Sequence, residues 1–247
     1  FIILNKKENV DYLKKHAPIG CRDYNTLQIL QNKGIDSYYS FCLTTTLDEK
    51  FKNKDKSNEI ILVDLLYSYD KSILRKLNLV QVIKKMPFRK LSKLKDYFMP
   101  KAKLRDFLPK EIIDNSTQLN HYVSSRQTNE ELYAVAKSYL KKYAKAKLVI
   151  TSRIHCALPC LALGTPVLFL MEGLTDEGLH MSRFRGILDH INILTNQNKG
   201  EFEKHFGKKM NVYNPEDIDW TSPPSNPDTF KSLSESLKQK CKEFMKY

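Results

Sequence analysis

Short apolar runs alternate with polar and helical segments along the first sixty residues of the chain. The predicted strands lie at Phe1–Leu4, Ala17–Cys21 and Asp36–Leu47, and the predicted helices at Glu8–Lys15 and Asn25–Asn32. Asp36–Leu47 is rich in β-branched and aromatic residues, and it includes the loop after its strand. This alternation is typical of a parallel sheet covered by helices.

A second alternating set begins at Glu59, after the wholly polar stretch Asp48–Asn58. Its predicted strands are Glu59–Leu66, Leu79–Ile83, Gln118–Val123, Lys147–Thr151 and Val167–Met171. Its predicted helices are Thr128–Tyr143, with Thr128 as the N-cap, Ile154–Leu163, Met181–Ile193 and the Lys-rich amphipathic tail Ser232–Tyr247. The pattern therefore predicts an α/β protein divided into residues 1–50, a linker at 51–58, a larger domain at 59–230 and a C-terminal helix at 231–247.

The net charge of +13 favours anionic partners. Ten basic residues lie between Val82 and Lys110, opposed only by Asp96 and Asp106. Such a run indicates either a solvated face or a surface that contacts anionic lipid at the inner side of a membrane. No apolar run is long enough to span a bilayer, and no zinc-ligand pattern or signal peptide is visible, so we expect a metal-free cytoplasmic protein. The chain opens inside an expected strand without Met, which indicates part of a longer protein.

Two charged clusters each follow a predicted buried strand. Arg22 and Asp23 come directly after the first, and Ser152, Arg153 and His155 lie in VITSRIHCALPC after the second. A helix begins at both places, so backbone amides and an Arg fork could converge there on a carboxylate or a phosphate. The alternatives are a salt bridge between Arg22 and Asp23, and a core histidine at position 155 that donates to a backbone carbonyl.

Further candidate groups lie at other predicted strand ends and loops. Arg183 follows a loop with two glycines (MEGLTDEGLH) that could close over a site, and His121 ends the strand QLNHYV. The chain contains no GxxxxGK[ST], GxGxxG, HExxH or GxSxG pattern, so a nucleotide cofactor is unsupported.

Three segments together resemble the polysaccharide pyruvyl transferase family. They are PIGCRDYNTLQILQNKGIDSYYSFCLTTTL, AKLVITSRIHCALPCLALGTPVLFL and MSRFRGILD, in the family's order and spacing, with Ile154 and Ile187 in place of Leu. The resemblance implies a fold like the GT-B glycosyltransferases, with two Rossmann-like halves facing a cleft. We expect the N-terminal half to be incomplete here, because only about twenty residues precede the GCRD segment.

The resemblance also implies transfer of pyruvate from phosphoenolpyruvate (PEP) to two hydroxyls of a sugar, forming a ketal. The acceptor would be a polymeric or lipid-linked glycan for the cell surface, with no metal or organic cofactor and no nucleic-acid partner. Carried over by position, Arg22, Arg153 and His155 would line the PEP site beside the Ile154 backbone. Two Arg forks suit the phosphate and carboxylate of PEP, and a histidine suits proton transfer.

The remaining candidates would support that site. Arg183 and His121 are expected to contact phosphate or acceptor, and Ser152 and Asp23 are included as substrate-binding residues. Two other functions remain open. One is a GT-B glycosyltransferase that uses a nucleotide sugar, since a fold does not determine its donor. The other is a non-catalytic basic module that binds anionic membrane or nucleic acid.

Overall fold

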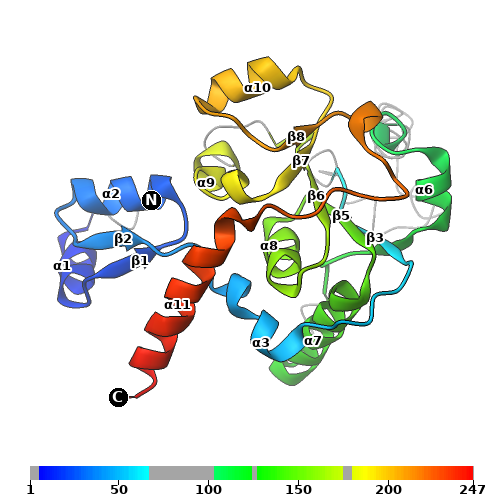
Figure 1. The fold of residues 1–247 in the computed structure, drawn as a ribbon. Helices are drawn as coiled ribbons and strands as arrows, with labels where there is room; N and C mark the ends of the chain where they lie inside the picture. Colours follow the sequence, from blue (N-terminus) through cyan, green and yellow to red (C-terminus); the bar gives the residue numbers. More distant parts are fainter. Residues whose placement is uncertain (1–5, 67–102, 124–126, 175–179, 247) are drawn as a thin grey trace, which may run out of the picture.

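The computed structural model describes residues 6–66, 103–123, 127–174 and 180–246 (Figure 1). Two of the predicted strands, at 1–4 and 79–83, lie outside the described residues. So does most of the basic segment 82–110, because the description resumes at residue 103.

Within the described residues, a six-stranded parallel sheet forms the centre of the larger part of the molecule. Its strands are β3 (Ile60–Val63), β4 (Thr117–Leu119), β5 (Leu148–Thr151), β6 (Val167–Leu170), β7 (Asn192–Leu194) and β8 (Val212–Tyr213). The spatial order is β4-β3-β5-β6-β7-β8, and every pair is parallel. The chain thus goes from β3 to one neighbour, β4, and then returns to β5 on the other side. Open α/β sheets bind ligands at such a reversal, outside the carboxyl ends of the strands.

Both faces of this sheet are covered, which explains why its central strands are apolar at nearly every position. Val149 and Phe169 face a core shared with α7 (Asn129–Lys145) and α8 (Ile154–Leu163). Ile150 and Leu168 face the opposite core, which includes Phe107 and the side chains of α6 (Lys110–Asn115). The α6 and α7 helices accordingly lie on opposite sides of the sheet (Figure 1). The prediction of an α/β protein with a parallel sheet is confirmed.

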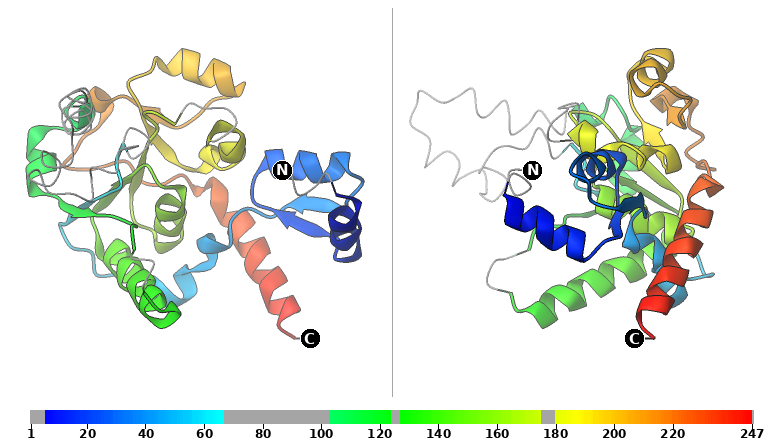
Figure 2. Two further views of the ribbon diagram at one scale, coloured as in Figure 1. Left: turned by 180° about the vertical axis from the view of Figure 1, so that it is seen from behind. Right: turned by 90° about the vertical axis from the view of Figure 1, so that its left-hand side faces the viewer.

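A smaller unit, residues 6–40, stands beside the large sheet (Figures 1 and 2). It consists of α1 (Lys7–Lys15), β1 (Ile19–Cys21), α2 (Tyr24–Asn32) and β2 (Ser37–Tyr39), with β1 and β2 parallel. Its core cluster is small, with Cys21, Leu30 and Ile35 buried. Two parallel strands connected through a helix have the βαβ arrangement of a Rossmann-like layer.

The C-terminal helix α11 (Lys231–Phe244) packs against the segment that leaves the small unit. That segment contains the 3-10 helix η2 (Leu43–Thr46) and the short helix α3 (Asp48–Phe51). On α11, Ser234 Oγ donates to Thr45 O over 2.8 Å, and Lys238 Nζ donates to Asp48 Oδ2 over 2.8 Å. The remaining elements are α9 (Ser182–Phe184), η7 (Leu188–His190), α10 (Lys199–Phe206), η8 (Pro215–Asp217) and η9 (Asp228–Phe230).

Several sequence predictions match the observed elements closely. Helix α8 has the predicted bounds, and α7 begins after the predicted N-cap. Thr128 Oγ1 accepts from the Glu131 amide, and the Glu131 carboxylate accepts from the Thr128 amide, which completes a capping box. The predicted strand at Gln118–Val123 is displaced, since the ladder is confined to Thr117–Leu119.

The predicted helix Met181–Ile193 is wrong. This stretch contains α9, then Gly186 with φ +86°, then η7 and the start of β7. A glycine in a positive-φ conformation ends a right-handed helix, so the apolar residues after it enter the sheet instead. The polar stretch Asp48–Asn58 also differs from expectation, because its first four residues form α3. In the described part of the chain, no helix has the length and apolar character needed to cross a membrane.

Candidate functional site

A cavity of about 420 Å³ lies beyond the carboxyl ends of three adjacent strands, β4, β3 and β5. Its walls come from the loop after β4, the turn between β5 and α8, the region of α9, and the small unit. The lining residues are Arg22, His121, Tyr122, Arg153, Ile154, His155, His180, Arg183 and Phe184. Among these described residues three are arginines, three are histidines and none is acidic, so this lining suits an anion.

The turn between β5 and α8 explains the charged residues within the apolar run at 149–170. Residues of β5 are buried, and Arg153 occupies the N-cap position of α8 with extended backbone (φ −104°, ψ 118°). The Arg153 amide donates to Thr151 Oγ1 over 2.9 Å, which fixes the turn. Arg153, Ile154 and His155 therefore follow the buried strand and the buried Ser152, at the point where the core meets the cavity.

The Arg153 guanidinium is held on two sides. Its Nε donates to Asp64 Oδ2 over 3.0 Å, and its centre lies 5.4 Å from the centroid of the Tyr122 ring. Asp64 directly follows β3, and its side chain is fully buried. A buried carboxylate and an aromatic face both favour a cation, and together they restrict the orientation of this side chain.

Arg22 and His155 meet across the boundary between the small unit and the large sheet. Arg22 Nη1 lies 2.8 Å from His155 Nε2. A guanidinium can only donate, so Nε2 is the acceptor and the neutral imidazole carries its proton on Nδ1. Partial burial of the ring and the positive charges of Arg22 and Arg183 lower the pKa of His155. The contact with Arg22 therefore requires a neutral His155 ring.

His121 contacts two tyrosines of α7. Its Nε2 lies 2.8 Å from the hydroxyl of the buried Tyr143, and its ring stacks on Tyr139 with centroids 5.6 Å apart. Burial is the main cause that lowers the pKa of His121, and Arg153 adds to it, while Asp64 opposes the change. His121 thus contributes a partly buried ring, held against two tyrosines, to the cavity wall.

Some polar atoms around the cavity have no hydrogen-bond partner among the described residues. They are Arg22 Nε, His180 Nδ1 and, behind Arg153, Asp64 Oδ1, and all three atoms are buried. An unsatisfied buried polar atom is costly, and such atoms are concentrated at sites that bind ligands. No group of three or more metal-binding side chains was found in the described residues.

A family model for polysaccharide pyruvyl transferases matches residues 5–172 of the chain. The chain belongs to the polysaccharide pyruvyl transferase family. The matched region contains the small unit, strands β3 to β6 and the Arg153–His155 turn, but it ends before Arg183. Comparison with curated proteins gave no match, and neither did comparison with solved structures.

Most of the site residues predicted for this pyruvyl transferase family member line the one cavity. These are Arg22, His121, Arg153, Ile154, His155 and Arg183. The other two candidates, Ser152 and Asp23, do not line it. Ser152 is buried and donates from Oγ to Leu170 O over 3.0 Å. Asp23 caps α2 by accepting from the Thr26 amide at 2.8 Å.

Other residues of the site were not predicted from the sequence. Tyr122, His180 and Phe184 line the cavity, and Asp64 lies behind Arg153. A signal for Asp64 was present, because it is the single charged residue in the apolar run IILVDLL, directly after a strand. The same reasoning that singled out Arg153 applies to it.

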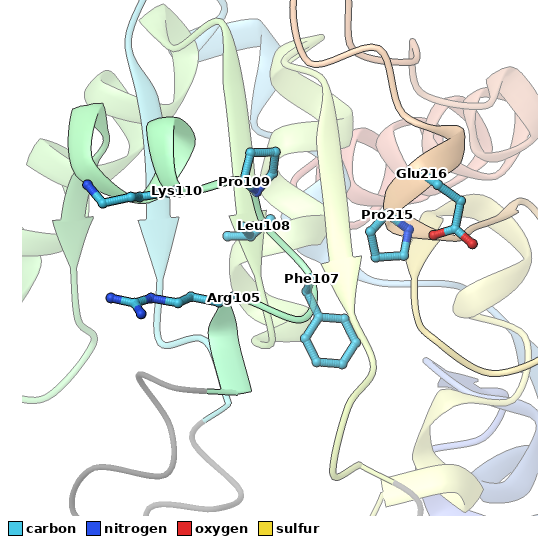
Figure 3. Close-up of a pocket in the computed structure, with 7 residues that line it drawn as sticks. All are labelled: Arg105, Phe107, Leu108, Pro109, Lys110, Pro215 and Glu216. Carbon is cyan, nitrogen blue, oxygen red and sulfur yellow. The ribbon is translucent and has the colours of Figure 1, made fainter.

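Another hollow of about 510 Å³ lies between residues 105–110 and η8 (Figure 3). Its two cations, Arg105 and Lys110, extend away from Pro215 and Glu216 and do not converge. In this respect the hollow differs from the cavity that Arg22, Arg153 and His155 line together.

Proposed function

We propose that this protein transfers the pyruvyl group of PEP to two hydroxyls of a glycan acceptor, forming a ketal and releasing phosphate. The observation that supports this best is the convergence of Arg22, Arg153, Arg183 and His155 on one cavity, in a chain of the pyruvyl transferase family. PEP carries a phosphate and a carboxylate, and guanidinium groups bind both in a planar, forked geometry.

The proposed reaction requires two proton transfers. The first hydroxyl attacks C2 of PEP and loses its proton, while the methylene carbon C3 gains a proton and becomes a methyl group. The second hydroxyl then displaces phosphate from C2 and loses its proton, which leaves with the phosphate. The products are the cyclic ketal and inorganic phosphate, and no oxidant or metal is needed for the balance.

The resting state of His155 suits the first of these steps. Its neutral ring can accept a proton from the attacking hydroxyl and deliver a proton to C3. Its Nε2 is engaged by Arg22 in the ligand-free protein. When the anion of PEP takes the Arg22 guanidinium, Nε2 is released. Substrate binding would thereby activate the base.

Binding of an anion is expected to raise the pKa of His155. The charges of Arg22 and Arg183 lower this pKa in the free protein, and a bound anion compensates for them. Anion binding therefore takes up protons between the free and bound pKa values, and affinity increases as the pH falls through that interval. An NMR titration of the His155 ring with and without inorganic phosphate measures this. In the absence of ligand, Arg22→Ala should raise the pKa of His155. If phosphate binding leaves the pKa of His155 unchanged in the wild-type protein, His155 does not lie at the anion-binding site.

The direct test of function is phosphate release from PEP in the presence of a panel of glycan acceptors. We expect phosphate to be released from PEP only when an acceptor is present, with one phosphate released for each ketal formed. Mass spectrometry would detect the ketal. Calorimetry with PEP, CMP-sialic acid and UDP-sugars provides the counter-test. Binding of a nucleotide sugar without binding of PEP would overturn the proposal in favour of a glycosyltransferase.

A further inference from the structure

Asp64 occupies an unusual place behind the anion-binding cavity. It follows β3 directly, at the sheet position between the ends of β4 and β5. Its backbone is left-handed (φ +46°), and so is that of Leu66 (φ +55°). Asp tolerates this conformation better than most residues, but such a backbone still has an energetic cost and is concentrated at functional sites. This strained backbone lies directly behind Arg153, a residue of the cavity wall.

The contacts of Asp64 connect two walls of the cavity. Its Oδ2 accepts from Arg153 Nε at 3.0 Å and from the His121 amide at 3.1 Å. Arg153 comes from the β5–α8 turn, and His121 comes from the loop after β4. The Asp64 side chain is 0% exposed, whereas that of Arg153 is 28% exposed. The carboxylate is thus enclosed, and the guanidinium reaches from it to the cavity.

We infer that Asp64 is a positioning residue that sets the orientation of the Arg153 guanidinium for anion binding. The His121 amide fixes the carboxylate, the carboxylate fixes Arg153 Nε, and the Tyr122 ring lies 5.4 Å from the guanidinium. This inference rests on the proposed function, in which Arg153 binds the phosphate or the carboxylate of PEP. Asp64 does not touch the substrate.

The direction in which PEP affinity changes when Asp64 is replaced distinguishes a positioning role from a purely electrostatic one. A carboxylate near an anion site repels the anion, so its removal by itself should strengthen anion binding. If Asp64 instead orients Arg153, its removal should weaken the binding of PEP in spite of the reduced repulsion. The two roles therefore predict opposite changes.

The test compares Asp64→Asn with a matched control, Asp48→Asn. Asp48 also pairs with a cation, Lys238, and also has a buried Oδ1 with no hydrogen-bond partner among the described residues. Its cation does not line the cavity, whereas Arg153, the partner of Asp64, does. We expect Asp64→Asn to raise KM for PEP by roughly ten- to a hundredfold, with a smaller change in kcat and an unchanged KM for the acceptor. Asp48→Asn should leave all three constants unchanged. Unchanged or tighter binding of PEP by Asp64→Asn overturns the inference.

A double-mutant comparison tests whether Asp64 acts through Arg153. In an Arg153→Ala background, Asp64→Asn should no longer raise KM for PEP. If Asp64→Asn raises KM for PEP in this background as much as in the wild type, Asp64 acts through another group and the inference is wrong.

The Arg153 Nε–Hε NMR signal gives a measurement that does not depend on PEP. We expect it to shift and to exchange faster with water in Asp64→Asn, but not in Asp48→Asn. An unchanged signal refutes the positioning role even if catalysis is confirmed. If the wild-type protein neither binds PEP nor releases phosphate while the signal shifts as expected, the proposed function is wrong. The contact by which Asp64 orients Arg153 is then still confirmed.

Discussion

Replacement of His155 by glutamine is expected to lower kcat for pyruvyl transfer by about two to four orders of magnitude, the usual contribution of a general acid–base group. The glutamine amide oxygen can still accept from Arg22, so the contact between the small unit and α8 can persist. It cannot exchange a proton between the sugar hydroxyl and C3 of PEP. KM for PEP should change much less, because the arginines bind the anion. Phosphate release under saturating PEP measures both constants.

His205→Gln is the matched control for this substitution. His205 is an exposed histidine on α10 that does not line the cavity, and its replacement should leave kcat unchanged. Circular dichroism and thermal unfolding establish that both variants are folded. Near-wild-type kcat in folded His155→Gln would remove His155 from the proton transfer.

Replacement of Gly186 by alanine is expected to lower the stability of the protein and, at the same time, to weaken the binding of PEP in the cavity. Gly186 has φ +86°, and an added Cβ would lie 2.8 Å from Cδ2 of Tyr24 and 3.1 Å from the Tyr39 hydroxyl. The backbone cost is about 1–3 kcal/mol, and overpacking against the ring adds about 1–3 kcal/mol. Because the segment that contains Gly186 also holds Arg183 at the cavity, we expect KM for PEP to rise. Denaturant unfolding and steady-state kinetics measure the two effects.

Two further variants separate strain from crowding at Gly186. Gly207 has φ +69° with nothing within 4 Å of an added Cβ, so Gly207→Ala should show the backbone cost alone. Tyr24→Ala removes the obstructing ring, and in combination with Gly186→Ala it should recover part of the kinetic defect. If Gly186→Ala and Gly207→Ala have the same effect on stability and on KM, the close packing of Tyr24 is unimportant.

The parts of the fold that could be predicted have strong local signals. The β5–α8 region combines a buried strand, a charged turn, a ten-residue apolar helix and a Gly-Thr-Pro turn, and its helix was predicted with the observed bounds. The start of α7 was equally clear, because Thr128 supplies its own capping hydrogen bond.

The errors occurred where tertiary contacts decide the local structure. MSRFRGILDHINI has enough apolar residues for a helix, but Gly186 packs under Tyr24 in a conformation that a helix cannot adopt. Residues 192–194 then pair with β6, a preference that such a short apolar run does not reveal. Strand β8 is only two residues long and depends wholly on its neighbour β7.

The site was predictable in its cations but not in the groups that hold them. Arg22, Arg153 and His155 stand out in the sequence because charges are rare directly after buried strands. Their partners come from distant positions: Asp64 is 89 residues from Arg153, and Arg22 is 133 residues from His155. Such pairings follow from the order β4-β3-β5 and from the approach of the small unit, neither of which a local pattern encodes.

The small unit also determines how well the site withstands heating. It contributes Arg22 to the cavity, yet its core cluster contains few buried residues, whereas the sheet that bears Arg153 and His155 has two extensive cores. Regions with little buried apolar area open at lower free energy than the rest of a protein. On warming, the unit that bears Arg22 should therefore detach while the sheet remains folded. Heat inactivation would then precede the loss of the fold, and the smaller unit would determine the temperature range in which the site is complete.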